Sequence, residues 1–182
     1  MKLIIFGPPG AGKGTQADSI SKRYNIEHIS TGEIFRDAAD KRTKFGIEAK
    51  EKYWSKGKLV PDNITIKIVE EKLRSVKNYI FDGFPRTLKQ AKELNKLSKP
   101  EIVISLTVPD DVLKIRLLKR AGFEGRSDDS LDIIENRIII YNKQTKPLLE
   151  FYKKENILIS IDGNRSIEFI SKDIFKILDK FE

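Results

Sequence analysis

The segment that most constrains this chain is GPPGAGKGTQ, residues 7–16, which directly follows the apolar run LIIF at residues 3–6. Four of the chain's 11 glycines lie in this short segment. With no side chains in the way, the backbone N–H groups from Gly10 to Gly14 can converge on an anion, and a helix beginning near Lys13 would add the positive end of its dipole. The segment therefore predicts a buried strand, a phosphate-binding loop and a helix.

The loop departs at one position from the general pattern G-x-x-x-x-G-K-[ST], because Gly14 follows the lysine and the hydroxyl comes next, at Thr15. We expect Lys13 to reach the outer phosphates from an exposed position on the loop. The usual magnesium-binding role of the hydroxyl stays open for Thr15. A glycine-rich turn without a ligand is the alternative, which the flanking strand and helix disfavour. A nucleoside triphosphate site alone fits GTPases, ATPases and kinases.

The rest of the sequence alternates between strand and helix patterns. Three of the β-type runs are apolar almost throughout, as in strands that are buried on both faces of a parallel sheet. This alternation favours an α/β sandwich with right-handed crossovers. We expect strands at 2–7, 28–30, 78–83, 101–109 and 157–162, and helices at 13–24, 62–77, 87–97, 110–120, about 130–154 and 166–181.

Two segments interrupt the alternation. Residues 31–60 predict short helices with no strand between them, and residues 121–130, AGFEGRSDDS, predict a loop rich in glycine and acidic residues. Both add little core, so we expect them to be peripheral flaps, which in compact α/β enzymes are often functional lids.

Composition narrows the class of protein. A chain of 182 residues, 39% hydrophobic and 34% charged, suits one folded domain. It has no apolar run of roughly 20 residues and begins directly with a strand, so we expect a cytoplasmic protein without a membrane partner. The absence of cysteine excludes disulfides and thiolate metal sites.

The net charge of +8 suggests polyanionic partners, nucleic acid among them. Most of the cations are scattered lysines, typical of a solvated surface. Arginine grips phosphate oxygens in pairs, so its placement is more informative. Six of the ten arginines fall in segments that we expect to line one cleft: Arg36, Arg86, Arg116, Arg120, Arg126 and Arg137.

The third expected strand ends in FDGFPRT, residues 81–87. Asp82 closes the strand, where it could hold magnesium through water or simply cap a turn. Gly83, Pro85 and Arg86 would form a rigid turn that directs a guanidinium from the carboxyl end of the sheet, where ligands bind in open α/β folds.

In combination, several motifs resemble those of the nucleoside monophosphate kinases, and of the adenylate kinases in particular. They are GPPGAGKGTQA, HISTGEIFR, GKLVPD, FDGFPRT and RSDD, in this order along the chain. The resemblance implies a P-loop NTPase fold, a three-layer α/β sandwich with a five-stranded parallel sheet. It further implies a core of residues 1–29, 61–118 and 131–182, an AMP-binding flap at 30–60 and a lid at 119–130.

The resemblance also implies an activity: reversible transfer of the terminal phosphoryl group of MgATP to AMP, giving two ADP. It makes ATP and AMP the partners of a monomer. The implied catalytic residues are Lys13, Arg86, Arg120, Arg126 and Arg137. The implied ATP-binding residues are Gly10, Ala11, Gly12, Lys13, Gly14, Thr15, Arg116 and Arg165. Those implied for AMP are Thr31, Arg36, Lys58, Leu59, Val60, Gly83, Phe84, Pro85, Arg86, Gln90, Arg126 and Arg137, with Thr15 and Asp82 near Mg²⁺.

The lid is short. Between Arg120 and Arg126 the chain has only AGFEG, which leaves no room for a small sheet and offers no cysteine for zinc. We therefore expect the short-lid form without a structural metal. The single histidine, His28, is predicted to be a structural residue at a strand end, since an ionised AMP phosphate needs no general base.

Three alternatives stay open at this point. A UMP or CMP kinase is the nearest, although such relatives tend to carry Ala at the position of Thr31 and Asn at that of Thr87. A nucleotide-dependent nucleic-acid-binding protein would fit the charge, but no RNA-binding motif is visible. A GTPase switch would need a base-reading Asn/Thr-Lys-x-Asp segment, which the sequence lacks.

Overall fold

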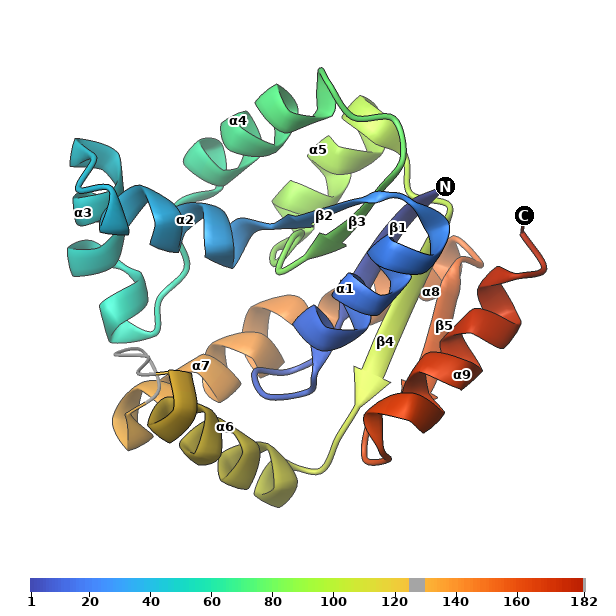
Figure 1. Cartoon of the computed structure of the whole chain (residues 1–182). Coiled ribbons are helices and arrows are strands. Elements are labelled where there is room, and N and C mark those ends of the chain that lie inside the picture. The colour runs from blue at the N-terminus through green and yellow to red at the C-terminus, as the bar shows by residue number, and fades with distance from the viewer. Residues whose placement is uncertain (125–129, 182) are drawn as a thin grey trace.

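A five-stranded parallel sheet forms the centre of the protein, which we describe from a computed structural model that covers residues 1–124 and 130–181. The strand order is β2-β3-β1-β4-β5, and every neighbouring pair is parallel (Figure 1). The predicted fold class is thus confirmed. The strands are β1 (Lys2–Phe6), β2 (Glu27–Ser30), β3 (Tyr79–Asp82), β4 (Ile102–Thr107) and β5 (Leu158–Asp162).

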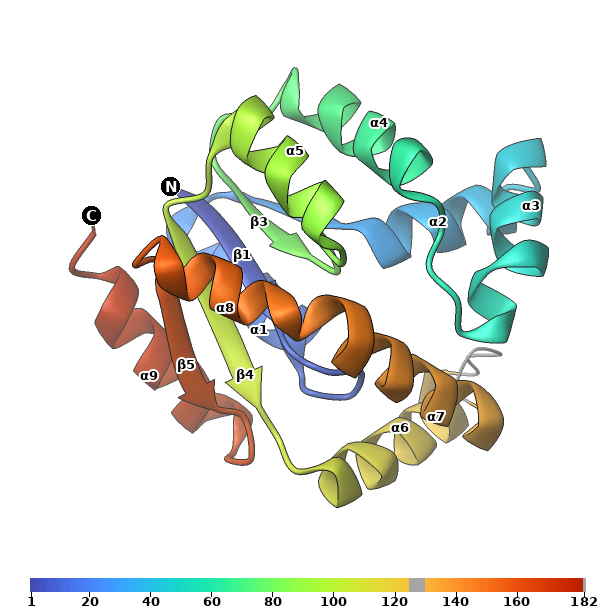
Figure 2. The ribbon, with the colours of Figure 1, turned by 180° about the vertical axis from the view of Figure 1, so that it is seen from behind.

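Helices cover both faces of the sheet (Figures 1 and 2). On one face, Leu3 and Ile5 of β1 share a buried cluster with side chains of α1 (Lys13–Tyr24) and α9 (Ile167–Leu178). On the other face, Ile4 and Phe6 pack with α4 (Asp62–Leu73), α5 (Leu88–Ser98) and α8 (Pro147–Lys154). Successive residues of a strand point to opposite faces, so an apolar run such as LIIF supplies both cores.

The segment between β2 and α4 adds no strand and stands out to one side of the sheet (Figure 1). It holds α2 (Thr31–Asp40), α3 (Lys44–Lys52) and the 3₁₀ turn η1 (Trp54–Lys56). A small cluster of its own, with Phe35, Ala49 and Val60 buried, holds these helices together. We call residues 30–60 the flap.

The region between β4 and α8 corrects two of the sequence predictions. Helix α6 (Asp110–Glu124) runs four residues past its predicted end, so residues 121–124 are helical rather than loop. Gly122 costs a helix only about 1 kcal/mol relative to alanine, which is too little to stop it.

The predicted helix at 130–154 is divided into three parts. Helix α7 (Leu131–Ile140) leads into a π-helical turn, η2 (Tyr141–Thr145), and then into α8. Within this turn the Lys146 N–H donates to the Tyr141 carbonyl, five residues back, at 2.8 Å. Pro147 has no N–H to continue an α-helical ladder, and a wide turn of this kind is frequent beside functional sites.

Within the part of the chain that the structure describes, no helix combines the length and the apolarity needed to cross a bilayer.

The carboxyl ends of β1, β2 and β3 lie at one edge of the sheet. Ile5 and Ser30 are each in register with Asp82, so the loop after β1, the start of the flap and the turn after β3 meet there.

Candidate active site

The phosphate-binding loop joins β1 to α1 at this edge. Gly12 is the N-cap of α1 and has a φ of 88°, in the left-handed region. A Cβ there would meet no described atom within 4 Å, so glycine is needed for conformation and not for space. Because Gly12 has no side chain that could cap the helix, the first N–H groups of α1 remain directed at the loop.

Lys13 is partly buried, which corrects the prediction of an exposed loop lysine. Its Nζ donates to the Pro8 carbonyl at 2.9 Å. Burial lowers the pKa of the Lys13 ammonium to about 8; Asp82 acts in the opposite direction, while Arg86, Arg137 and Arg120 lower that pKa further. The charges that act on Lys13 therefore come from three other segments of the chain.

The turn after β3 is organised around one carbonyl. The Gly83 oxygen accepts hydrogen bonds from Arg86 Nε at 2.7 Å and from Thr31 Oγ1 at 2.9 Å. Gly83 has a φ of 77°, and a Cβ on it would lie 2.8 Å from Arg86 Nη2. Asp82 lies beside the start of α1, since a Cβ on Gly14 would be 3.6 Å from its Oδ2.

A groove lined by basic side chains runs along the loop; we call it the cationic groove. The acidic residues Asp18, Glu33 and Asp82 also line it, and Asp82 is the one whose charge raises the pKa of Lys13. The predicted site residues that line this groove are Gly10, Gly12, Lys13, Gly14, Thr15, Arg36, Asp82, Gly83, Arg86, Arg116, Arg120 and Arg137.

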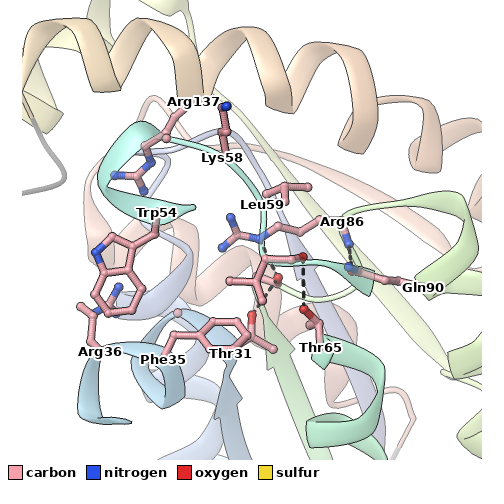
Figure 3. A pocket seen from close by; sticks show the side chains of 14 residues that line it. Thr31, Phe35, Arg36, Trp54, Lys58, Leu59, Thr65, Arg86, Gln90 and Arg137 are labelled. Atoms are coloured by element: carbon pink, nitrogen blue, oxygen red, sulfur yellow. Dashed lines mark hydrogen bonds between the residues drawn. The ribbon is translucent and has the colours of Figure 1, made fainter. Parts of the chain in front are cut away.

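A second cavity lies between the flap and the β3 turn; we call it the inner pocket (Figure 3). Its walls combine the apolar side chains of Phe35, Trp54 and Val60 with the buried polar side chains of Thr31 and Gln90. The predicted site residues that line it are Thr31, Arg36, Lys58, Leu59, Val60, Gly83, Arg86, Gln90 and Arg137.

The two cavities adjoin. Arg36, Gly83, Arg86 and Arg137 line both of them. A third hollow, which includes Lys13, Pro85 and Tyr141, connects them beneath η2. Burial raises the pKa of the Tyr141 hydroxyl to about 12, so this group stays neutral at physiological pH.

The end of the flap touches α7 across the cleft. Asn136 Nδ2 donates to the Lys56 carbonyl at 2.5 Å, and a Cβ on Gly57 would lie 3.3 Å from Arg137 Cγ. This contact brings Arg137 of α7 to the wall of both cavities.

Some predicted residues lie elsewhere. The side chains of Ala11 and Phe84 are buried in the two sheet cores, so only their backbone could face a ligand. Arg165 pairs with Asp173 at 2.6 Å, and the described lining of the two cavities does not include it. Arg126 falls outside the residues that the structure describes.

Two predicted residues have structural contacts beyond the cavities. Arg116 Nη1 donates to the Gly163 carbonyl at 3.0 Å, which ties α6 to the turn after β5. His28 lies in β2, with Nδ1 2.8 Å from Asp18 Oδ1.

Sequence reasoning missed part of the inner pocket, namely Gly32, Phe35, Trp54, Gly57 and Thr65. Trp54 carried a usable signal, because the only tryptophan of the chain stands in the flap rather than in a strand or core helix. Thr65 carried none, since it lies within a regular helix pattern.

Among the described residues there is no group of three or more His, Asp or Glu side chains that could hold a metal ion by themselves. The Asp82 carboxylate beside Gly14 and the Thr15 hydroxyl in the groove are hard oxygen donors of the kind that Mg²⁺ prefers.

Known proteins resemble this chain over almost its whole length. The family model described as adenylate kinase matches residues 5–157. An adenylate kinase of Leptospira biflexa is 49% identical over 96% of this chain and 98% of its own length. One from Cyanothece is 45% identical over 100% of this chain and 96% of its own length. One from Carboxydothermus hydrogenoformans is 42% identical over 99% of this chain and 100% of its own length.

The last of these alignments extends over 215 positions, more than the 182 residues of this chain, so that relative carries insertions which this chain lacks. This agrees with the short form expected from the sequence. The motif order, the sheet topology and these matches lead to the same assignment. The chain belongs to the adenylate kinase family.

Proposed function

We propose that this chain catalyses the reversible transfer of the terminal phosphoryl group of MgATP to AMP, giving two ADP. One observation carries the proposal: the cationic groove and the inner pocket adjoin at Arg36, Arg86 and Arg137. A triphosphate lying along the loop and a monophosphate seated in the inner pocket would present their phosphates to each other at this junction.

The residues at the junction suit phosphoryl transfer. The transition state spreads negative charge over the equatorial oxygens, and fixed positive charge stabilises it. Lys13, Arg86, Arg120 and Arg137 supply that charge, and their mutual effect on the pKa of Lys13 reflects how close they lie. Arg126 joins them in the proposal on the strength of the sequence motif.

Mg²⁺ would be held by the nucleotide phosphates, with Thr15 and Asp82 nearby and water between Asp82 and the ion. When bound, it would neutralise part of the phosphate charge. Lys13 would bind the outer phosphates, and the N–H groups of α1 and of the loop at Gly10 and Gly12 would orient them.

The inner pocket would hold AMP. Its apolar walls fit an adenine ring, while Thr31 and Gln90 offer hydrogen-bonding groups at buried positions. Arg36 and Arg86 would bind the phosphate. The remaining lining residues, Lys58, Leu59 and Val60, would enclose the nucleoside.

Transfer to AMP must prevail over transfer to water. The contact between Asn136 and the Lys56 carbonyl closes the flap against α7, over the junction. Such closure excludes water during the reaction. Closure of a mobile segment over bound substrates is a known feature of adenylate kinase. We further propose that the enzyme works as a cytoplasmic monomer.

The proposal is tested by a coupled assay with MgATP and each of AMP, UMP and CMP, where the fastest turnover is expected with AMP. Faster turnover with UMP or CMP would reassign the acceptor. Inhibition by two adenosines joined through five phosphates tests the geometry, because one molecule can fill both cavities only if they face each other. Binding of this compound at one adenosine alone would contradict the proposed arrangement.

A further inference from the structure

Asp62 occupies a position that links the flap to the helix bearing Gln90. It is the first residue of α4, separated from the flap only by Pro61, and is partly buried. Its Oδ1 accepts a hydrogen bond from Gln90 Nε2 at 2.7 Å, and its Oδ2 accepts one from Thr87 Oγ1 at 3.0 Å. The described residues that line the inner pocket include Gln90 but not Asp62, so Asp62 contacts the pocket only through its partner.

The Gln90 amide is held at both ends. While Nε2 donates to Asp62, Oε1 accepts from the backbone N–H of Arg86 at 2.7 Å (Figure 3). A carboxylate can only accept and a backbone N–H can only donate. Turning the amide over would therefore set two acceptors against each other at Asp62 and two donors at Arg86. Gln90 is 2% exposed, so either mismatch would leave polar groups unpaired at a buried position.

The fixed Gln90 amide can still accept one hydrogen bond and donate one. Gln90 keeps one lone pair on Oε1 and one hydrogen on Nε2, and it lines the inner pocket, so a base seated there would meet these two groups in one spatial order. A 6-aminopurine presents an acceptor at N1 and a donor at its amino group, which matches that order. A 6-oxopurine presents a donor at N1 and an acceptor at O6, which matches only the amide turned over.

We propose that Asp62 is a specificity-determining positioning residue, which holds the Gln90 amide in the orientation that pairs with a 6-aminopurine and rejects a 6-oxopurine. The inference rests on the proposed function, in which Gln90 meets the base of the monophosphate. Asp62 itself touches neither substrate nor reacting atoms.

The first test is Asp62→Asn, which keeps the shape of the side chain but can present either a donor or an acceptor to Gln90. Dissociation constants for AMP and for inosine monophosphate are measured by calorimetry for the parent and the variant. The ratio of the two constants is expected to fall about tenfold in the variant, since one of the two groups that fix the amide no longer discriminates. Equal weakening of both ligands would overturn the proposal, because Asp62 would then only support the flap.

The second test asks whether Asp62 acts through Gln90. In a Gln90→Ala background the substitution Asp62→Asn is expected to leave the ratio of the two dissociation constants unchanged. The same tenfold fall in that background would overturn the proposal. This double-mutant cycle isolates the coupling between the two side chains.

Asp110→Asn is the matched control. Asp110 is likewise an acidic residue in the first turn of a helix, α6, so its replacement removes the same kind of charge from a helix N-terminus. The control is expected to keep the parent ratio, and a fall like that of the Asp62 variant would overturn the proposal. Failure of the proposed function is distinguished by the parent protein, which would then bind AMP and inosine monophosphate with equal dissociation constants before any substitution is made.

Discussion

The cationic groove and the inner pocket adjoin, yet they differ in the charge and the hydrogen bonding of their characteristic side chains. In the groove, Lys13 lies among arginines that repel it, and burial lowers its pKa to about 8. In the inner pocket, Thr31 and Gln90 are neutral, buried and hydrogen-bonded to groups of fixed donor or acceptor character. The groove thus gathers positive charge around Lys13, whereas the pocket presents neutral groups that already make several hydrogen bonds.

We expect this difference to separate two tasks of the enzyme. Concentrated positive charge stabilises a transition state but distinguishes poorly among phosphates. Satisfied neutral hydrogen bonds add little to the rate but penalise a base whose pattern does not fit. Substitutions in the groove should therefore change turnover, and substitutions in the pocket should change affinity and selectivity.

The largest effect is expected for Lys13→Met, which removes a charge from the groove while keeping a long side chain. Steady-state assays should show kcat/KM for MgATP reduced by about 10³-fold, as when one preorganised charge is lost from a transition-state site. Circular dichroism should show an unchanged fold. Activity within a few-fold of the parent would remove Lys13 from the mechanism and end the contrast between the two regions.

Arg86→Ala should come next, because Arg86 lines both regions. A reduction of kcat by about 10²-fold is expected together with a weaker AMP affinity, since its contact strengthens as charge develops. Arg86→Lys should recover little, because a lysine cannot reproduce the guanidinium that bonds to the Gly83 carbonyl. An effect confined to AMP affinity would place Arg86 with the inner pocket alone.

The pH dependence of the groove follows from Lys13. Its pKa of about 8 means that the ammonium form is lost above that pH in the free enzyme. The kcat/KM for MgATP should therefore fall about tenfold per pH unit above pH 8, and the Lys13→Met variant should lack this limb. A parent profile that stays flat to pH 10 would contradict the assignment.

Thr31→Ala should affect the inner pocket more modestly. The KM for AMP is expected to rise by about 3- to 10-fold with little change in kcat, since a neutral hydrogen-bonding group is removed. Thr43→Ala is the matched control: Thr43 caps α3 on the outer flap, and its loss should cost about 1 kcal/mol of stability without changing the KM. A comparable rise of the KM in the control would attribute the effect to flap stability.

The smallest effect is a gain in stability for Lys13→Met. The folded pKa of Lys13 lies below its usual value of 10.5, so the unfolded chain binds more protons between pH 8 and 10.5, and parent stability rises with pH in that window. Below pH 8 the variant should be more stable by about 1 kcal/mol, after allowance for the partial exposure of the side chain. Chemical denaturation at pH 7 and pH 10.5 measures this, and a less stable variant at pH 7 would contradict it.

Much of the fold was predictable because its signals are local. Strand β1, the loop and the start of α1 follow from the fourteen consecutive residues 3–16, and the alternation of apolar runs with helix patterns predicts the parallel sheet. The π-helical turn at 141–145 was not predicted, since only Pro147 marks it in the sequence. The extension of α6 to Glu124 departs from the predicted loop at 121–130, because glycine and acidic residues are typical of loops but do not by themselves end a helix.

The candidate site likewise contains residues that sequence motifs predict and contacts that only the folded chain creates. Residues in motifs, such as Lys13 and Arg86, were assigned from sequence, and the structure places both on the wall of the cleft. The partial burial of Lys13 was not foreseen, because it depends on side chains from distant segments. Asp62 was visible in LVPD, but its bond to Gln90 joins positions 28 residues apart that only the folded chain brings together.

The shared carbonyl of Gly83 has a practical consequence for anyone who would redesign this enzyme. One oxygen anchors both the first residue of α2 and the Arg86 guanidinium, and its glycine leaves no room for a side chain between them. Under the proposed function, we therefore expect the tightness of acceptor binding and the rate of transfer to depend together on this single peptide unit. A directed-evolution campaign that samples this position should recover variants in which both properties decline together, and none in which one improves alone.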